Sequence, residues 1–261
     1  MEDIQAPVDV QIRSQLLDLA MGQRKCEICN VDEDSPISFG QNYCVVCTRV
    51  KNWWKIFAKN VPRHYRHILM ETLAPSDKSR LPFAKQVEVI NQIRSEPTKS
   101  YAFFGPAGTS KTTFCVALFE QALWDDLDNC ARSYWGEPQL STWRKSTKYL
   151  LDEFVAYSTG KEVDGKPAKL PSVNRRVIDQ LGRQGIAYRP RLFLEEIDKV
   201  AYSKFKTDTL FELIDSIYEN EGQLVFNTNL TIPEFEAQFG TKEGPAFTRR
   251  IGESMEVFNF F

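Results

Sequence analysis

The sequence predicts an α/β domain in which helices cover both faces of a parallel β-sheet. From Pro82 onward, short apolar segments alternate with longer segments whose apolar residues recur at helical spacing. The short segments lack the in-out alternation of half-exposed strands, which is typical of parallel strands buried on both faces. A glycine-containing turn, "GPAGTSKTT", follows one apolar segment and opens the next helix.

Each predicted element has its own signal. Gly22 ends a short amphipathic helix from about Asp9 to Met21. Prolines and turn formers between Leu73 and Pro82 mark the approach to the main domain, and Ser146 is placed to cap the helix that follows it. In chain order we expect helix 82–94, strand 100–105, helix 111–124, strand 141–145, a helix through 158, a polar loop over 159–171, helix 172–182, strand 191–196, helix 209–219, strand 223–229 and a last strand within 254–261.

Length and charge limit the class of protein. A chain of 261 residues that is 42% hydrophobic can hold one α/β core and a small appended module. The chain opens without the pattern of a signal peptide, and no stretch is apolar for long enough to span a bilayer. We therefore expect a cytoplasmic protein with no membrane partner. The net charge of −2 means that any contact with nucleic acid depends on a local basic patch.

Two cysteine pairs near the start of the chain have nearly the spacing of a zinc site. Cys26 and Cys29 form one C-x-x-C pair and Cys44 and Cys47 the other, with fourteen residues (30–43) between them. Four thiolates suit tetrahedral Zn²⁺, and a cytoplasmic chain would not keep two structural disulfides. We therefore expect structural zinc in preference to redox or disulfide use. The predicted division is an N-terminal helix and zinc-binding module over residues 1–58 and a main domain over residues 59–261.

The turn after the first strand has the phosphate-loop pattern G-x-x-x-x-G-K-[ST], except that Ser110 stands in place of a glycine. Such a loop holds phosphate with backbone N–H groups at the start of a helix, so ATP and Mg²⁺ are the expected ligands. Lys111 would reach the outer phosphates and Thr112 would hold Mg²⁺. Ser110 carries a cost only if its position needs a positive φ or a close backbone approach. The alternative is a turn without a ligand. The expected nucleotide-binding residues of the loop are Gly105, Pro106, Ala107, Gly108, Thr109, Ser110, Lys111, Thr112 and Thr113.

Acidic residues follow a later apolar strand. Glu195 and Glu196 stand at its carboxyl end, where ligands of open α/β sheets bind. Glu195 is suited to hold Mg²⁺, and Glu196 to orient and deprotonate the attacking water. We expect Asp198 to be a helix cap or a solvated residue, with help at the metal as a further option. The alternative for the whole group is a charged loop after a core strand.

Two further groups are candidates for a role at a γ-phosphate. The strand 223–229 ends in asparagines, and an amide there would polarise the attacking water, although asparagine clusters also simply make turns. Late in the chain, Arg249 and Arg250 follow Pro245. An arginine offered to the γ-phosphate of a neighbouring subunit would stabilise transition-state charge. The alternative is an ordinary surface pair.

The segment from Arg49 to His67 has six basic residues and no acid, together with several aromatic residues. This composition suits contact with single-stranded DNA, through phosphates and stacked bases. Alternatively, Trp53, Trp54 and their aromatic neighbours anchor a partner protein or pack against the main domain. A second candidate contact is the polar loop over 159–171, which carries Lys161, Lys166 and Lys169.

Taken in order, "NVPRHYRHILMETLAP", "FFGPAGTSKTT", "LFLEEID", "LVFNTNLT" and "AFTRRI" resemble the AAA+ ATPases of the DnaC and DnaI helicase-loader and IstB transposition-helper group. The resemblance covers roughly residues 61–261 and implies a P-loop NTPase fold of the AAA+ type, without a C-terminal lid. It further implies that Lys111 and Thr112 are Walker A residues, Glu195 and Glu196 the Walker B acids, Asn229 the sensor residue and Arg250 the arginine finger.

Several functions remain open. The first is a replication helicase loader, in which the zinc module grips a replicative helicase, ATP assembles a homo-oligomer through Arg250, and the ATPase face binds single-stranded DNA. The second is a transposition helper that polymerises on duplex DNA and recruits a transposase. The third is a scaffold that binds nucleotide without hydrolysis, because Ser110 replaces the usual glycine and Glu195 the usual aspartate. A zinc module before the ATPase domain favours the loader. Some viral helicases have similar motifs, so unwinding is a further alternative.

Overall fold

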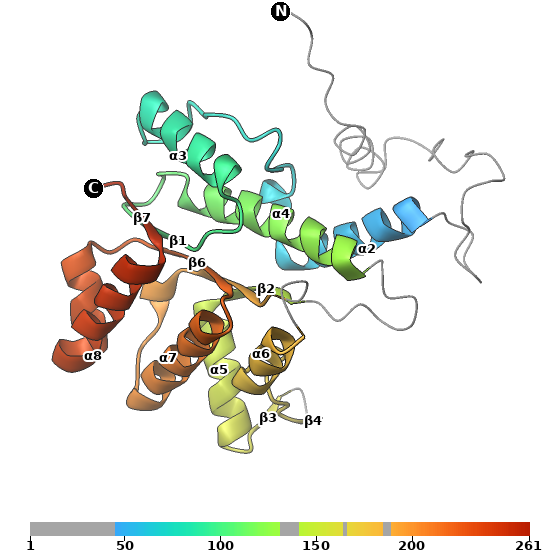
Figure 1. Cartoon of the computed structure of the whole chain (residues 1–261). Coiled ribbons are helices and arrows are strands. Elements are labelled where there is room, and N and C mark those ends of the chain that lie inside the picture. Colours follow the sequence, from blue (N-terminus) through green and yellow to red (C-terminus); the bar gives the residue numbers. More distant parts are fainter. Residues whose placement is uncertain (1–44, 131–140, 164–165, 185–188) are drawn as a thin grey trace, which may run out of the picture.

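The computed structural model describes residues 45–130, 141–163, 166–184 and 189–261 (Figure 1). The predicted helix from Asp9 to Met21 lies outside these ranges, as do Cys26, Cys29 and Cys44. The zinc site therefore stays a prediction. Within the described ranges, no helix combines the length and the apolar character needed to cross a membrane.

A five-stranded parallel sheet forms the centre of the molecule, and this confirms the predicted fold class. The two faces of the sheet belong to different apolar cores. Tyr101 and Phe103 of β1 (Tyr101–Phe104) point into one core, whereas Ala102 and Phe104 point into the other, so every residue of β1 is buried. This explains why the strands lack polar alternation. The order across the sheet is β2 (Thr142–Ser146), β5 (Arg191–Glu195), β6 (Gln223–Thr228), β1 (Tyr101–Phe104) and β7 (Glu256–Asn259).

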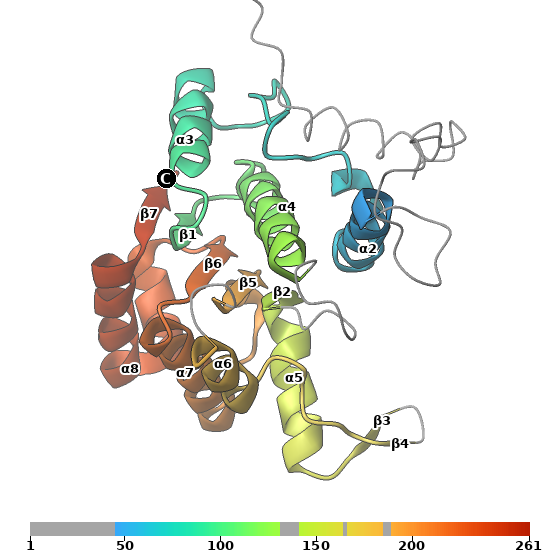
Figure 2. The ribbon, with the colours of Figure 1, turned by 45° about the vertical axis from the view of Figure 1, so that its right-hand side comes forward.

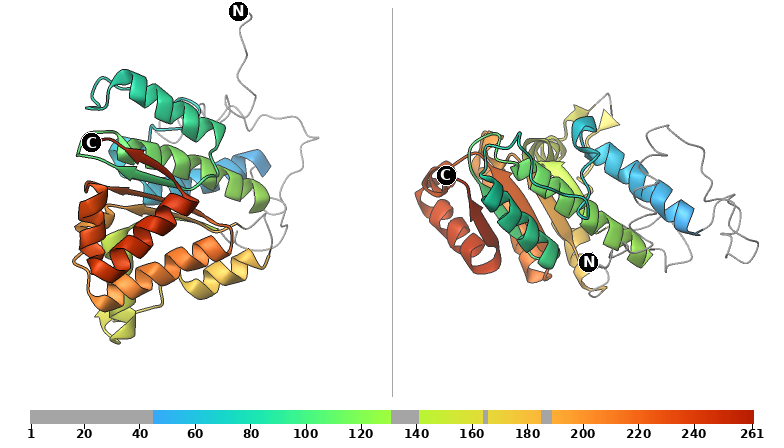
Figure 3. Two further views of the ribbon diagram at one scale, coloured as in Figure 1. Left: turned by 60° about the vertical axis from the view of Figure 1, so that its left-hand side comes forward. Right: turned by 90° about the horizontal axis from the view of Figure 1, so that it is seen from above.

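Helices cover both faces, as the views in Figure 1 and Figure 3 show. On one face lie α2 (Val45–Asn60), α3 (Phe83–Ser95) and α4 (Lys111–Cys130). On the other lie α5 (Thr147–Ser158), α6 (Arg175–Gly182), α7 (Lys204–Glu219) and α8 (Ile232–Ser254).

Helix α2, a short β-hairpin and helix α8 were not predicted. The short antiparallel hairpin of β3 (Glu162–Val163) and β4 (Lys166–Pro167) lies within the polar loop after α5 and projects from the domain (Figure 2). Helix α8 follows β6 and is kinked at Gly240, where φ is 88°. Ser146 stands at the start of α5 as predicted, but its side chain makes no capping hydrogen bond.

Helix α2 packs against α4, and its aromatic residues are part of the domain core. Trp53 and Phe57 are fully buried and stack with their ring centroids 5.1 Å apart. Phe57 also stacks on Phe119 of α4. These two rings are therefore not available to stack on DNA bases, and the structure supports the alternative of packing against the main domain. The helix continues across the predicted boundary between residues 58 and 59.

Arg66, one of the predicted basic contacts, has a structural role. Its guanidinium donates hydrogen bonds to the backbone oxygens of Ala58 and Val61, at 2.5 and 2.9 Å. These carbonyls lie at the C-terminal end of α2, where the helix itself supplies no donors. Arg66 therefore ends the helix and is not free for DNA.

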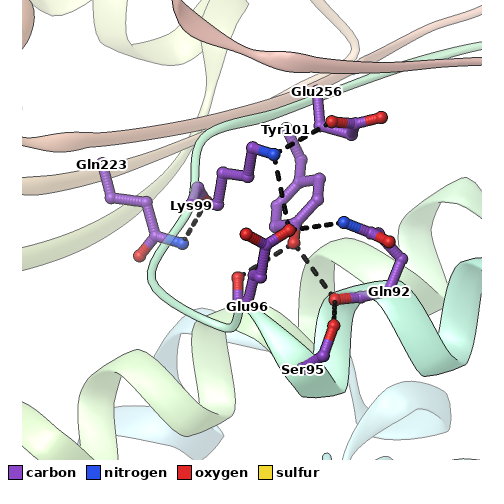
Figure 4. Close-up of polar contacts among 7 residues, drawn as sticks. All are labelled: Gln92, Ser95, Glu96, Lys99, Tyr101, Gln223 and Glu256. Atoms are coloured by element: carbon purple, nitrogen blue, oxygen red, sulfur yellow. Dashed lines mark hydrogen bonds and ion pairs between the residues drawn. The ribbon is translucent and has the colours of Figure 1, made fainter.

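A polar network closes the edge of the sheet at which the strands begin (Figure 4). Lys99 Nζ lies 3.0 Å from a carboxylate oxygen of Glu256, and this contact raises the pKa of Lys99. The side chain of Gln223 donates to the backbone oxygen of Lys99 at 2.7 Å, and Tyr101 Oη donates to the backbone oxygen of Glu96 at 2.9 Å. These bonds tie the starts of β1, β6 and β7 to the end of α3. Ligands are therefore expected at the opposite, carboxyl edge.

Candidate nucleotide site

The predicted site residues come together at the carboxyl edge of the sheet. The loop 105–110 joins β1 to α4, the acidic residues follow β5, and Asn229 follows β6. All three strands are parallel, and β6 lies between the other two. Their carboxyl ends must therefore be neighbours, and the acids are on the same edge as Lys111.

Lys111 is held inside the loop that it follows. Its Nζ donates to the backbone oxygens of Gly105 and Pro106, at 2.6 and 2.8 Å, and to Asn229 Oδ1 at 3.2 Å. The side chain is almost fully buried; burial lowers the pKa of Lys111, and the Asp198 carboxylate opposes this effect. The loop is thus already closed around its lysine, with the ammonium group beside the end of β6.

Ser110 has a left-handed backbone conformation, with φ of 62°. This is the condition under which replacing the usual glycine carries a cost, because a Cβ is disfavoured there by roughly 1 to 2 kcal/mol. The backbone oxygen of Ser110 still accepts a hydrogen bond from Phe114 N at 3.1 Å, in the first turn of α4. The loop therefore keeps its form and stores strain at one residue.

Relief of this strain is testable with Ser110→Gly. We expect the free energy of unfolding to rise by up to about 1 kcal/mol, since glycine adopts positive φ without the Cβ penalty. Urea denaturation measures the change. Glu221→Gly is the matched control, because Glu221 has φ of 50° at a turn away from the site. Stabilisation by Glu221→Gly without stabilisation by Ser110→Gly would show that the loop is unstrained.

Glu195 is paired with a buried arginine that the sequence analysis did not identify. Its Oε1 forms an ion pair with Arg144 Nη2, from the neighbouring strand β2. Burial raises the pKa of Glu195, and the Arg144 charge opposes the shift. Arg144 also donates to the backbone oxygen of Asn60, the last residue of α2. Any Mg²⁺ at Glu195 must therefore compete with a guanidinium.

Glu196 lies just past the end of β5 and points away from the core. Its backbone has φ of 52°, and its half-exposed side chain forms an ion pair with Lys199. The backbone N–H of Glu196 donates to Asn227 Oδ1 at 3.0 Å. The Asn227 amide in turn contacts Cys115, whose burial raises the pKa of the thiol to about 12. Cys115 is thus a buried thiol in the core beneath α4.

Asp198 holds Asn229 in place. Its two oxygens accept hydrogen bonds from the backbone N–H and the Nδ2 of Asn229, each at 3.1 Å. Because the Asn229 amide nitrogen faces Asp198, its Oδ1 faces Lys111. The expectation that Asp198 is a helix cap or a solvated residue was wrong. The position of Asp198, three residues after the end of β5, was a signal that the sequence offered. Its partner Asn229 could not be identified in the same way, because it lies 31 residues further along the chain.

The two late arginines lie near the end of α8, far along the chain from the loop. Arg250 forms an ion pair with Asp215 of α7, and its guanidinium lies 5.8 Å from the ring centroid of Tyr218. Arg249 is more exposed and lies 3.7 Å from Glu253. Since α8 leads to the start of β7, this part of it is near the edge opposite Lys111. An arginine finger at Arg250 stays a prediction and concerns the nucleotide of another subunit.

A second surface lies at the same carboxyl edge, toward β2. It consists of Lys148, Tyr149, Lys204 and Phe205, and we name it the aromatic-lysine surface. Both pairs lie in the first turns of their helices, α5 and α7, and both aromatic side chains are exposed, by 71% for Tyr149 and 43% for Phe205. Lys206 joins the two helices through a 2.7 Å ion pair with Asp152. This surface could not be predicted from the sequence, because the two pairs are far apart in the chain.

No protein-family model and no curated protein matches this sequence. Solved structures do match its fold. The DnaC helicase loader is 16% identical over 77% of this chain and 100% of the loader chain, with a TM-score of 0.50. DnaI is 14% identical over 77% of this chain and 92% of its own, with a TM-score of 0.46. AMPPCP-bound DnaA from Aquifex aeolicus is 11% identical over 74% of this chain, with a TM-score of 0.47, and this chain spans 50% of that chain's length. This chain therefore shares the fold of the DnaC helicase loader, a parallel sheet covered by helices.

Proposed function

We propose that this protein is an ATP-hydrolysing AAA+ protein that acts on DNA as a loader of a replicative helicase. The observation that carries the proposal is the contact between Lys111 Nζ and Asn229 Oδ1, at 3.2 Å. This contact joins the lysine of the phosphate loop to the side-chain amide of Asn229, which directly follows β6, the strand beside β1. A γ-phosphate placed at Lys111 would meet this amide, so one small site would both bind ATP and respond to its hydrolysis.

Each residue of the site has a defined part in hydrolysis. Loop N–H groups and Lys111 would hold the phosphates, and Asn229, oriented by Asp198, would direct the attacking water. Glu196 is the base for that water, since its side chain is exposed beyond the strand end. The hydroxyl of Thr112 and the carboxylate of Glu195 are oxygen ligands of the kind that Mg²⁺ prefers. When bound, Mg²⁺ neutralises the charge on the phosphates.

Support for a DNA ligand comes from the aromatic-lysine surface. Exposed aromatic rings beside lysines suit base stacking combined with phosphate contact on single-stranded DNA. The likeness of its fold to that of the DnaC helicase loader supports the loader role. Assembly into a homo-oligomer would place Arg250 at a neighbouring nucleotide, after its release from Asp215. The cysteines Cys26, Cys29, Cys44 and Cys47 remain the proposed zinc ligands of the helicase-binding module.

The test of this function uses Glu196→Gln. The amide cannot accept the proton of the attacking water, so we expect DNA-stimulated phosphate release to fall by roughly 100-fold or more while ATP binding persists. Glu88→Gln, an exposed site on α3, is the control and should keep the wild-type rate. Affinity capture with the ATP-bound Glu196→Gln protein should retain a replicative helicase. Capture of a transposase instead would select the transposition helper.

The DNA contact is tested by replacing both exposed rings, Tyr149→Ser with Phe205→Ser. We expect affinity for single-stranded DNA to fall about 10-fold or more, because each stacked base contributes roughly 1 to 3 kcal/mol. Fluorescence anisotropy with a labelled oligonucleotide measures the loss. Tyr157→Ser removes another exposed tyrosine from α5 and should leave affinity unchanged. Equal losses in both proteins would point to a different DNA surface.

A second candidate, a scaffold that binds nucleotide without hydrolysis, is favoured by the ion pair between Arg144 and Glu195. A guanidinium on the proposed Mg²⁺ ligand would hinder metal binding and slow hydrolysis, whereas the phosphate loop is unaffected. ATP binding without Mg²⁺-dependent phosphate release, with and without DNA, would select the scaffold.

A further inference from the structure

We propose that Arg80 is a second cationic phosphate ligand at the nucleotide site, beside Lys111. The inference rests on the proposed nucleotide site and extends it to a segment, 76–81, that precedes the phosphate loop by more than twenty residues in the chain. The sequence motifs do not include Arg80.

The first observation is that Arg80 lies directly on the phosphate loop. Its backbone N–H donates to the backbone oxygen of Gly108 at 2.8 Å. Its side chain runs flat across the same glycine, since a Cβ added at Gly108 would lie 3.3 Å from Cδ and 3.4 Å from both Cγ and Nε of Arg80. Because Gly108 has no side chain, the side chain of Arg80 can pack directly on the backbone of the loop.

The second observation is that the guanidinium has no protein partner in the part of the chain that the structure describes. Arg80 is exposed, and no hydrogen bond or ion pair of its side chain occurs among the described residues. This contrasts with Arg66, Arg94 and Arg144, whose guanidinium groups donate to backbone or carboxylate oxygens. Arg80 therefore keeps its five donors available at the loop.

The third observation is that the segment carrying Arg80 is firmly held. Gln86 of α3 is buried, and its Oε1 accepts from Ser76 N at 2.8 Å. Its Nε2 donates to the backbone oxygens of Ser76 and Leu81, at 3.2 and 2.8 Å. Leu81 is itself buried. A buried amide thus fixes both ends of the segment, and the arginine is positioned before any ligand arrives.

These observations agree with the chemistry of phosphate binding. A guanidinium offers a planar pair of N–H donors that matches two phosphate oxygens, and such charge-assisted bonds are stronger than neutral ones. Preorganisation reduces the entropy lost when the ligand binds. Lys111 would contact the phosphates with a compact ammonium group from within the loop, and Arg80 would offer paired N–H donors from the outer surface of the loop.

The experiment compares nucleotide affinity in charge variants at this position. Arg80→Met keeps the stem that packs on Gly108 and removes the donors. Wild-type protein and each variant are titrated with fluorescent ATP and ADP analogues in the presence of Mg²⁺. We expect Arg80→Met to weaken binding of one or both nucleotides by roughly 10-fold or more and Arg80→Lys to recover part of the loss. Lys78→Met removes a charge from the same exposed segment and should bind within about twofold of wild type.

A purely structural role for Arg80 gives a different result. Arg80→Met would then bind both nucleotides as wild type does, and this result would overturn the inference. Thermal unfolding of each variant checks the fold, and Arg80→Gln is the second uncharged variant if Arg80→Met is unstable. Wild-type protein that binds neither nucleotide would remove the proposed function and this inference together, whereas loss of binding in Lys111→Ala but not in Arg80→Met or Arg80→Gln would remove the inference alone.

Discussion

Replacing Lys111 with alanine is expected to abolish ATP binding, with Kd raised by at least about 100-fold. The variant loses the ammonium group that would contact the phosphates. It also loses the bonds from Nζ to the backbone oxygens of Gly105 and Pro106, which hold the loop closed. A charged hydrogen bond contributes roughly 1.5 to 3 kcal/mol, so loss of the phosphate contact together with loop order accounts for an effect of this size.

Titration with a fluorescent ATP analogue measures the effect of Lys111→Ala. The matched control is Lys99→Ala, which removes a lysine and its ion pair with Glu256 at the opposite edge of the sheet. Lys99→Ala should bind ATP as wild type does. Unchanged ATP affinity in Lys111→Ala would refute the nucleotide site and, with it, the proposed function.

The second large effect is expected on stability, from Trp53→Ala. Trp53 is fully buried, stacks on Phe57 and meets the edge of Trp124 with ring centroids 6.0 Å apart. Truncation of a large buried aromatic residue costs roughly 3 to 5 kcal/mol, because its contacts are lost and a cavity remains. Such a loss is a large fraction of the stability of a typical domain.

Trp54→Ala is the natural comparison, because Trp54 is the next residue and is only partly buried. We expect a smaller loss for Trp54→Ala, about 1 kcal/mol, measured by urea denaturation of both variants. Equal and small losses would mean that α2 is not part of the cooperative core. With the expected result, a fragment that begins at residue 59 lacks core side chains and should unfold more readily than the full chain.

The part of the site that lies within one continuous segment could be predicted from sequence. The strand 101–104, the loop and the start of α4 follow one another without interruption, so a local pattern contains all the information. The same holds for β5 and β6, whose apolar residues are buried on both faces. The paired acids and Asn229 were found because they stand at the ends of such strands.

Contacts between distant segments could not be predicted. Arg144 meets Glu195 across 51 residues, and Lys111 meets Asn229 across 118. No spacing rule connects such residues before the strand order is known. The positive φ of Ser110 was undetermined for a related reason, since serine itself gives no signal of that conformation. Helix α8 was missed because Gly240 and Pro245 interrupt its helical pattern.

The position of β1 between β6 and β7 has a consequence for biosynthesis. Among the described residues, β1 pairs only with β6 and β7, which begin at Gln223 and Glu256, so β1 stays without a strand partner while about 120 further residues are made. At a ribosomal rate of roughly 5 to 20 residues per second, this interval lasts on the order of ten seconds. During this interval, the apolar segment Tyr101–Phe104 of the nascent chain has unpaired backbone groups and can associate with other chains. We expect chaperones to be needed most at this stage of translation.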